Sequence, residues 1–458
     1  MNCHYKYVSM TLIILVFFIL VHNYFLGSAR HGIWERSKLS FVSMVENPRT
    51  FNDNSQNFKL FGRTKPISVD KNQLSKLYLH DTSFGTTSSL DERFNFKIYV
   101  YELPLWANVL IRKRNPWCNN GVFSSEIYVH KQLLDNVHGV RTWDPEQADF
   151  FFIPVYATCL VYRSFSQFPK YRFLIEEVLR YIINEMPYWK RTQGRDHIWP
   201  FVHDFGGCLS WLDNTDHIYF KELRNSIFLS HLGDLNMGCF STYKDIVIPP
   251  LMKDSRLWNE GKGDKSINLK NKSIFAHFRG TVNWYHDVGH YALKIKGGFS
   301  PHYSNGVRQY LLRTYKSDPM MKIYEGPSKN YLEEVKSSLF CLCPRGFAPW
   351  SRRFFDSVAL GCIPVIIADN IELPFEEFID YRKFTVKVME SDISNLKSIL
   401  LSIPKQRIVK MLKELRKSWI HFTYQQPKSK KEDAFALILR KLARKVQVYK
   451  PSGGSNWV

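Results

Sequence analysis

Short apolar runs alternate with amphipathic helical segments through most of this 458-residue chain. Residues 150–155 read FFFIPV, and residues 196–202 form another largely apolar run, DHIWPFV. Between them, residues 171–189 place apolar side chains at the i, i+3 and i+4 positions of a helix. Strands that are apolar on both faces are typical of parallel sheets covered by helices. The alternation therefore predicts an α/β fold built on parallel sheets.

The alternation occurs in two successive blocks of similar size. The first opens with the strand-like residues 96–101 (FKIYVY), and the second opens with residues 273–280 (SIFAHFRG). We expect a first lobe at residues 94–268 and a second lobe, with a terminal amphipathic helix, at residues 269–458. The polar residues 28–93 show no sustained apolar period and predict a stem that precedes both lobes.

The N-terminus carries an apolar segment. Residues 8–27 approach the roughly 20 residues that span a bilayer, and residues 10–21 carry no charge. We expect a signal-anchor transmembrane helix at residues 8–27, after a cytoplasmic tail at residues 1–7, with the rest of the chain in the lumen. A cleaved signal peptide is the alternative, because Gly27 and Ala29 suit a cleavage site and most flanking positive charge follows the segment. Both place the protein in the secretory pathway.

The composition is strongly basic, with a formal net charge of +21. Such an excess favours an anionic partner, for example a nucleic acid, a polyanion or a phosphate-bearing substrate. Entry to the secretory pathway argues against a nuclear nucleic-acid role. A charge that only keeps the surface solvated is the alternative.

The chain has eight cysteines. Cys3 would face the cytosol, which leaves seven in an oxidising lumen. We expect disulfides among these seven, with at least one thiol left free or paired to another chain, and the sequence leaves the pairing open. Asn271 begins an acceptor sequon for N-glycosylation, Asn-Lys-Ser.

A cationic loop separates two apolar runs at residues 343–367, CPRGFAPWSRRFFDSVALGCIPVII. Ser351 can cap a helix whose first turn holds Arg352 and Arg353. Cations are unfavourable in the first turn of a helix, because the helix dipole is positive there. A bound anion such as a diphosphate would offset that cost, and Asp356 on the same helix could accept hydrogen bonds from a ribose. A basic surface loop beside a core strand is the alternative.

Several long motifs occur in the order and form of a known family. They are YVYELP, SEIYVHKQL, RTWDPEQADFFFIPVY, PYWKRTQGRDHIW, HDFGGC, FRG and FCLCPRGFAPWSRRFFDSVALGCIPVIIADNIELPF. On these motifs, residues 96–445 resemble the exostosin family of glycosyltransferases, in particular its plant cell-wall branch. The resemblance implies two Rossmann-like lobes of the GT-B type, a type II Golgi membrane protein, a nucleotide-sugar donor, usually linked to UDP, and inversion at the anomeric carbon. It also implies that the donor lies mainly on the second lobe.

Individual motif positions follow from this resemblance and from the cationic loop. The residues assigned to the donor are Arg279, Gly280, Arg345, Gly346, Ser351, Arg352, Arg353 and Asp356. Asp356 stands where the family usually has Glu, and Arg345 and Arg352 stand where xylan-synthesis members have Leu and Pro. The segments GRDHIW and YSNGVRQYL instead resemble members that modify cell-wall glycoproteins. The subgroup therefore stays open.

An inverting transferase needs one general base to take the proton of the acceptor hydroxyl. His203 and Asp204 lie where a strand of the first lobe should end, beside a Gly-Gly turn. We expect Asp204 to be the catalytic base, with His203 and then Glu126 as the other candidates. The structural alternatives are that Asp204 caps the next turn and that Glu126 pairs with an arginine.

No Asp-x-Asp pair occurs in the sequence. Metal-dependent glycosyltransferases use such a pair to hold Mn²⁺ or Mg²⁺ on the diphosphate. Because arginines stand at a helix start instead, we expect side chains and the helix dipole to replace the metal. Neither a metal nor another cofactor is predicted.

Together these features predict a Golgi enzyme that transfers xylose, glucuronic acid, galactose or arabinose from a UDP-sugar, with inversion, to a polysaccharide or a glycoprotein glycan. Its partners would be that donor, the glycan acceptor, the membrane and other glycosyltransferases in a hetero-complex, but no nucleic acid. One alternative is a non-catalytic structural subunit of a Golgi polysaccharide synthase complex. Another is a secreted polyanion-binding protein, for which residues 428–435 supply only one short lysine-rich run. The presence of Arg279 and Arg353 favours activity.

Overall fold

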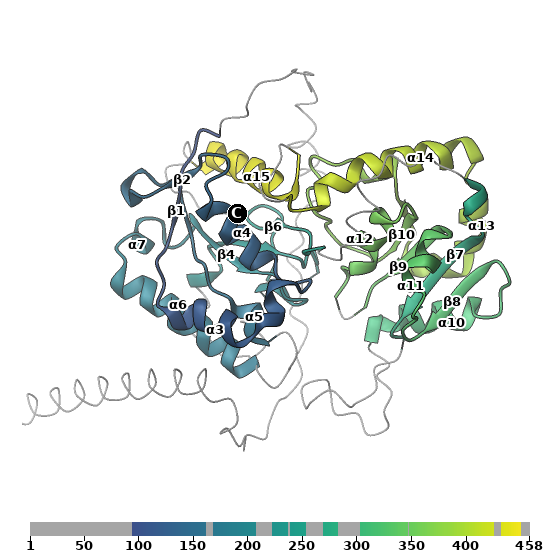
Figure 1. The fold of residues 1–458 in the computed structure, drawn as a ribbon, viewed down its shortest axis with the longest axis horizontal. Helices are drawn as coiled ribbons and strands as arrows, with labels where there is room; N and C mark the ends of the chain where they lie inside the picture. The colour runs from purple at the N-terminus through teal and green to yellow at the C-terminus, as the bar shows by residue number, and fades with distance from the viewer. Residues whose placement is uncertain are drawn as a thin grey trace, which may run out of the picture. The chain divides into compact units, whose positions relative to one another are not determined.

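The computed structural model describes most of the chain after residue 93 (Figure 1). The described residues are 94–161, 168–207, 222–236, 239–252, 269–282, 303–346, 348–425 and 432–449. The predicted tail, signal anchor and stem lie outside the described residues. Among the helices of the described part, none is both long and apolar enough to cross a membrane.

The first sheet confirms the predicted parallel α/β fold. Its strands run in the order β2-β1-β3-β4-β5-β6, and every neighbouring pair in the described residues is parallel. The strands are β1 (Ile98–Val100), β2 (Arg141–Thr142), β3 (Phe150–Phe152), β4 (His197–Phe201), β5 (Ile227–Ser230) and β6 (Ile246–Val247). Residues of β3, β4 and β5 are buried throughout, as expected for strands covered on both faces.

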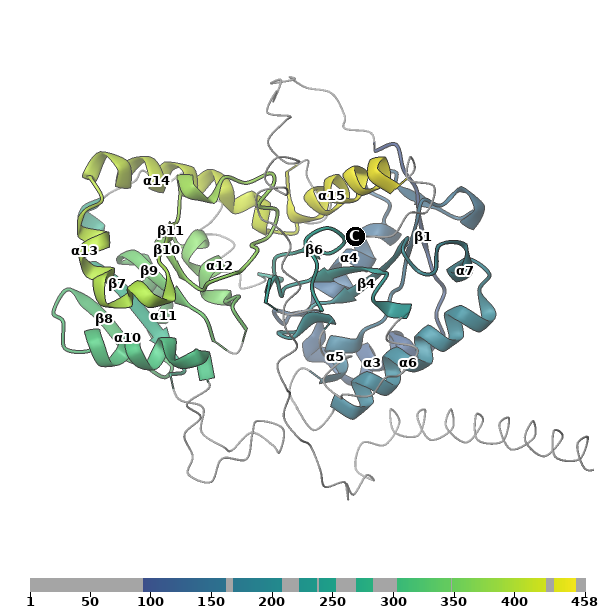
Figure 2. The same cartoon turned by 180° about the vertical axis from the view of Figure 1, so that it is seen from behind.

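Helices cover this sheet on both faces. They are α3 (Val109–Arg114), α4 (Ser125–Leu134), α5 (Ala157–Val161), α6 (Phe168–Glu185) and α7 (Trp189–Thr192). From one face, Val129 of α4 shares a hydrophobic cluster with Phe150 and Phe152. The intervening Phe151 faces the other way and stacks on His197, with ring centroids 5.0 Å apart. Figure 2 shows α3, α5 and α6 side by side.

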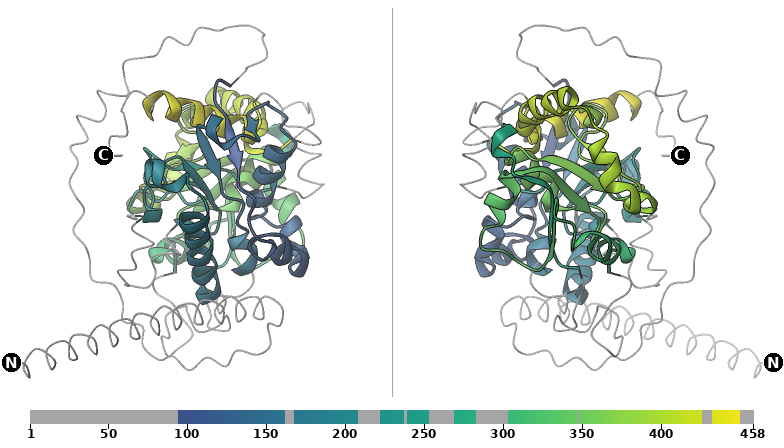
Figure 3. Two further views of the ribbon diagram at one scale, coloured as in Figure 1. Left: turned by 90° about the vertical axis from the view of Figure 1, so that its left-hand side faces the viewer. Right: turned by 90° about the vertical axis from the view of Figure 1, so that its right-hand side faces the viewer.

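The second sheet is also parallel, in the order β11-β10-β9-β7-β8. Its strands are β7 (Ile274–Gly280), β8 (Met321–Glu325), β9 (Ser338–Pro344), β10 (Ile363–Ile367) and β11 (Val386–Lys387). The helices around it are α10 (Val307–Tyr315), α11 (Tyr331–Lys336), α12 (Arg352–Ala359), α13 (Leu396–Leu401) and α14 (Lys405–Ser418). Its strands have the usual twist of an open sheet, which Figure 3 displays.

Both sheets reverse their strand order at one point, between β1 and β3 in the first sheet and between β7 and β9 in the second. At such a reversal the connections leave in opposite directions and open a crevice at the carboxyl ends of the strands. In the second sheet, β7 ends with Arg279-Gly280 and β9 ends at Pro344, just before Arg345-Gly346. Four of the predicted donor residues therefore lie at the place where open α/β sheets bind ligands.

The last helix, α15 (Ala434–Tyr449), contacts residues of the first sheet's lobe. The ring of Phe435 lies 5.9 Å from that of His138, and Lys445 Nζ donates to the backbone oxygen of Tyr243 at 2.6 Å. Just before α15, the hydroxyl of Tyr424 donates to the backbone oxygen of Pro249 at 2.9 Å. Because Lys441 Nζ of α15 also lies 3.4 Å from Glu377 Oε1 of the second lobe, the terminal helix contacts both lobes.

Disulfides occur in each lobe, as expected for an oxidising compartment. Cys118 is bonded to Cys159, Cys341 is bonded to Cys362, and Cys239 is also disulfide-bonded. Within the described residues the free cysteine is Cys343, which is buried. The prediction of disulfides with a thiol left over is confirmed.

Candidate active site

The helix start that the sequence predicted is present. Ser351 is the N-cap of α12, and its Oγ accepts hydrogen bonds from the backbone N–H of Arg353 at 3.3 Å and from Arg353 Nη1 at 3.0 Å. Helix α12 therefore begins at Arg352, directly after the loop that leaves β9. The positive end of its dipole faces the crevice at the strand ends.

Arg353 reaches from α12 to the end of β7. Its Nη2 and Nε donate to the backbone oxygen of Arg279 at 2.8 and 3.3 Å, and its guanidinium carbon lies 4.8 Å from the ring centre of Phe278. A Cβ at Gly280 would collide with Nη2, so glycine is what admits the side chain here. No carboxylate among the described residues pairs with Arg353, which leaves its charge available to a ligand.

A second cation lies beside it that sequence reasoning missed. Arg308 of α10 is 6% exposed, and it donates to the backbone oxygens of Thr281 at 2.9 Å and Arg345 at 2.8 Å. It also donates to the hydroxyl of Tyr303 at 2.8 Å. Burial, together with the charge of Arg353, lowers the pKa of Arg308 to about 10. Its neighbours among the described residues are carbonyl and hydroxyl groups, so this charge too has no carboxylate partner.

The missed arginine had a local signal. Gly306 caps α10 and Arg308 stands in its first turn, the same arrangement of a cation at a helix start that singled out Arg353. Gly346 supports the arrangement, because a Cβ there would lie 2.6 Å from Arg308 Nη2. The close backbone approach of Gly280 to Arg353 thus has a counterpart at Gly346.

Three other predicted arginines are paired within the lobe. Arg279 donates to both carboxylate oxygens of Glu334, at 2.8 and 3.2 Å. Arg345 Nη1 lies 3.4 Å from Glu390 Oε1, and the half-exposed Arg352 lies 3.3 Å from Asp356 Oδ1. These side chains have their charge balanced, unlike Arg308 and Arg353.

Asp356 lies deeper than the sequence suggested. Its side chain faces α11, where the hydroxyl of Tyr331 donates to Oδ2 at 3.2 Å, and the residue is 3% exposed. Burial raises the pKa of this carboxyl, while Arg352 opposes the shift. In this structure its hydrogen bonds are made within the lobe.

Asp204 follows β4 and faces residues of the second lobe. Burial raises the pKa of Asp204 to about 6, a shift that the side chain of Trp350 opposes. Burial also raises the pKa of Tyr303, and the charge of Asp204 adds to that increase. Because Tyr303 hydrogen-bonds Arg308, Asp204 stands next to the pair of unbalanced arginines.

The other two base candidates have different surroundings. His203 is 4% exposed, its Nδ1 accepts from the backbone N–H of Phe205 at 3.4 Å, and burial lowers its pKa to about 3. Glu126 is 1% exposed and accepts from the backbone N–H groups of Thr158 and Cys159, at 3.2 and 2.8 Å. These are first-turn donors of α5, so Glu126 caps that helix, and burial raises its pKa to about 8.

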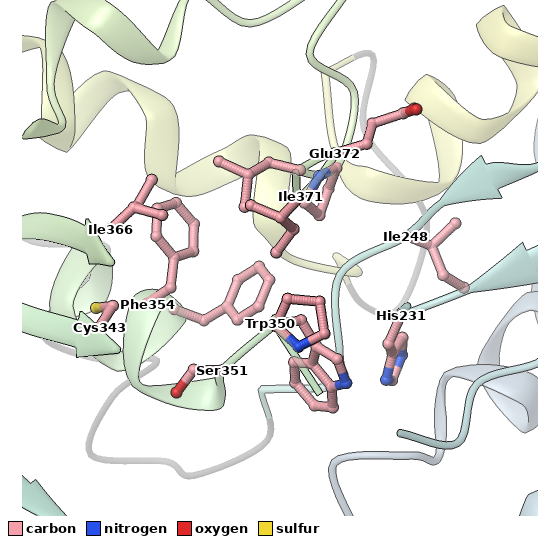
Figure 4. Close-up of a pocket in the computed structure, with 13 residues that line it drawn as sticks. His231, Ile248, Cys343, Trp350, Ser351, Phe354, Ile366, Ile371 and Glu372 are labelled. Carbon is pink, nitrogen blue, oxygen red and sulfur yellow. The ribbon is translucent and has the colours of Figure 1, made fainter. Parts of the chain in front are cut away.

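A small pocket adjoins the start of α12 (Figure 4). His231 and Ile248 line it from the first lobe, and the remaining walls come from the second lobe. Those walls are Cys343, Pro349, Trp350, Ser351, Phe354, Phe355, Ile366, Ile371, Glu372, Leu373 and Pro374. It is largely apolar with a few polar groups, which is typical of ligand pockets. In the described part of the chain, no cluster of three His, Cys, Asp or Glu side chains is arranged to hold a metal.

Comparison with known proteins agrees with the sequence motifs. Residues 93–403 match the Exostosin GT47 domain. The chain is 34% identical over 369 residues to the probable beta-1,4-xylosyltransferase IRX10L of Arabidopsis thaliana, covering 80% of this chain and 85% of the relative. It is 36% identical over 349 residues to the probable glucuronoxylan glucuronosyltransferase IRX7 of the same plant, covering 73% and 74%.

Solved structures are more distant. The crystal structure of Anabaena Alr3699/HepE in complex with UDP-glucose has a TM-score of 0.33 and 10% identity, covering 78% of this chain and all 100% of its own. A likeness this weak does not bear on function. The family match and the relatives' identity over most of their length are sufficient by themselves to assign the family. The chain belongs to the exostosin GT47 family of glycosyltransferases.

Proposed function

We propose that the protein is an inverting glycosyltransferase that moves a sugar from a UDP-sugar to a polysaccharide or a glycoprotein glycan. One observation carries this proposal: Arg308 and Arg353, both without a described carboxylate partner, converge at the carboxyl ends of β7 and β9. Two unbalanced cations at one crevice favour a bound anion, and charge-assisted hydrogen bonds to phosphate are among the strongest available. The diphosphate of a nucleotide sugar supplies that anion.

The reaction is a single displacement at the anomeric carbon. The acceptor oxygen forms a bond to C1 while the bond from C1 to the diphosphate oxygen breaks, and UDP leaves with the electron pair. Arg308, Arg353 and the start of α12 stabilise the negative charge that develops on UDP. Asp204 takes the proton of the acceptor hydroxyl, a role that its pKa of about 6 suits because it is ionised at neutral pH and still basic.

The other base candidates fit this role less well. In the proposal Glu126 serves the fold, because its carboxylate caps α5. His203 stays second, because its Nδ1 already accepts a backbone hydrogen bond. The crevice is filled with arginine charge, and so we propose transfer without a metal or another cofactor.

The relatives' names narrow the choice of donor sugar. They are a probable xylosyltransferase and a probable glucuronosyltransferase, so UDP-xylose and UDP-glucuronic acid come first, ahead of UDP-galactose and UDP-arabinose. We further propose a Golgi location with a type II anchor at residues 8–27. The exposed Asn271 is accessible to N-glycosylation in that compartment.

The test uses the full-length protein, the four UDP-sugars and an acceptor panel of xylan and glycoprotein oligosaccharides, with EDTA present. We expect UDP release and a matching increase in acceptor mass with one sugar, and loss of both in the Arg353→Ala variant. UDP binding without turnover on any acceptor would indicate a non-catalytic subunit of a synthase complex. Failure to bind UDP would contradict the assignment of this crevice as the donor site.

A further inference from the structure

His231 is held firmly at the edge of the first sheet. It directly follows β5 and is 2% exposed. Its Nε2 lies 2.8 Å from the hydroxyl of Ser125, and its ring stacks on Phe123 with centroids 5.7 Å apart and planes at 27°. Trp350 of the second lobe closes a further side, with centroids 5.1 Å apart and planes at 68°. The imidazole therefore has one orientation.

The second ring nitrogen of His231 is left over. Nδ1 is buried, and no described residue hydrogen-bonds it. A buried polar atom without a partner is uncommon in a folded protein and calls for an explanation such as a ligand. His231 also lines the pocket beside α12, where Figure 4 shows its imidazole beside Trp350. Ser351, the cap of the arginine-bearing helix, lines the same pocket.

The chemistry of the ring indicates what it would bind. Burial, with the nearby His203 adding to it, lowers the pKa of His231 to about 3, so the imidazole is neutral near neutral pH. A neutral imidazole has one N–H and one lone pair, and the Ser125 hydroxyl can either donate to Nε2 or accept from it. Nδ1 can therefore act toward a ligand either as a hydrogen-bond donor or as a hydrogen-bond acceptor. A sugar hydroxyl, which both donates and accepts, matches such a group better than a phosphate or a carboxylate does.

The walls of the pocket point to the same class of ligand. Trp350 and Phe354 present aromatic surface, on which the apolar face of a sugar ring can pack. His231 belongs to the first lobe, whereas the arginines assigned to the diphosphate belong to the second. A sugar held by His231 therefore approaches the donor from the opposite lobe, as an acceptor must.

We propose that His231 is an acceptor-binding residue whose Nδ1 hydrogen-bonds a hydroxyl of the acceptor sugar beside Trp350. This inference rests on the proposed function and adds the acceptor side of the same site. Its removal should weaken acceptor binding while leaving UDP binding and the hydrolysis of the UDP-sugar by water unchanged.

The test compares two substitutions of His231 in the full-length protein. His231→Gln can keep a polar atom near Ser125 and loses the one at Nδ1, whereas His231→Asn keeps a polar atom near Nδ1 and loses the contact with Ser125. We expect His231→Gln to raise the acceptor KM about tenfold, the size of one lost hydrogen bond to a buried group, with kcat within about twofold. His231→Asn should recover part of that loss.

His130→Gln is the matched control, because His130 is hydrogen-bonded to Tyr156 and does not line the pocket. It should leave the acceptor KM unchanged. An equal effect of His231→Gln on UDP-sugar hydrolysis would overturn the inference in favour of a donor contact. A loss confined to kcat would overturn it in favour of a role in proton transfer.

Direct binding separates this inference from the proposed function. Saturation-transfer NMR with xylan-derived and glycoprotein-derived oligosaccharides should show contact to the wild-type protein and a loss in His231→Gln. Lack of saccharide binding by the wild type, or equal binding by the variant, overturns the role of His231. Lack of UDP binding instead overturns the proposed function, whatever the saccharides do.

Discussion

The guanidinium of Arg353 lies 2.8 Å from the backbone oxygen of Arg279, and this hydrogen bond joins the start of α12 to the end of β7. It crosses the point at which the strand order of the second sheet reverses. The bond uses one edge of the guanidinium and a neutral acceptor, so the positive charge is positioned without being cancelled. A phosphate that enters the crevice meets a cation whose orientation is already set.

Arg353→Lys should weaken UDP binding by about tenfold or more, because an ammonium lacks the planar fork that contacts Arg279, Ser351 and a phosphate together. Isothermal titration calorimetry with UDP measures this. Arg382→Lys is the control, because Arg382 is 91% exposed and pairs only locally with Asp380. Equal UDP affinity in the Arg353 variant and the wild type would remove Arg353 from the donor site.

Gly280→Ala should also weaken UDP binding by about tenfold, because the added methyl displaces the Arg353 guanidinium from its bond to Arg279. Gly346→Ala tests the same idea at Arg308, whose Nη2 would lie 2.6 Å from the new Cβ. Calorimetry with UDP and a melting curve distinguish a local from a global effect. Normal UDP binding by either glycine variant would show that displacing the neighbouring arginine does not affect the donor site.

The reaction should need an ionised Asp204. Burial favours the neutral carboxyl and raises its pKa to about 6, so Asp204 is protonated below that pH and ionised above it. We expect kcat/KM to fall about tenfold per pH unit below pH 6 and to level off above it. Initial rates from pH 4.5 to pH 8 measure this profile. Asp204→Asn should abolish turnover and retain UDP binding, and a flat acid limb in the wild type would argue for another base.

The disulfide between Cys341 and Cys362 should stabilise the second lobe. It ties β9 to the residue before β10 across a sequence separation of 21, for which loop-closure entropy predicts about 3 kcal/mol. Urea denaturation of a Cys341→Ala, Cys362→Ala double variant tests this. Cys343→Ala is the comparison, since it leaves the disulfide intact and should cost only about 1 kcal/mol. Equal midpoints for the double variant and the wild type would contradict the prediction.

Local signals were sufficient for the elements around the site. The residues 343–367 contain a strand, a loop and a helix in an order that depends only on neighbours in sequence, and Ser351 caps α12 as predicted. Most of the periodic segment at 171–189 lies in α6, and the apolar run at 196–202 contains β4. Capping and periodicity act within a few residues, so they can be read without knowing the fold.

The partners of the charged side chains could not be predicted in this way. Arg279 was assigned to the donor, yet Glu334, 55 residues further along, balances it. The unbalanced charge of Arg308 could not be predicted, because its acceptors, Thr281 and Arg345, lie 27 and 37 residues away and meet only where β7 and β9 end side by side. Asp356 was expected near a ribose, whereas α11 covers it and Tyr331 takes up its carboxylate.

The sequence by itself determined the family, through the resemblance of its motifs. It also determined the parallel α/β architecture and the cationic helix start at Ser351, because period and capping act along a continuous stretch. Only the tertiary structure decided which cations have no carboxylate partner and which nitrogen of His231 has no hydrogen-bond partner among the described residues. Charge balance and hydrogen-bond satisfaction depend on what the folded chain places within about 3 Å of an atom, and that distance is independent of distance in sequence.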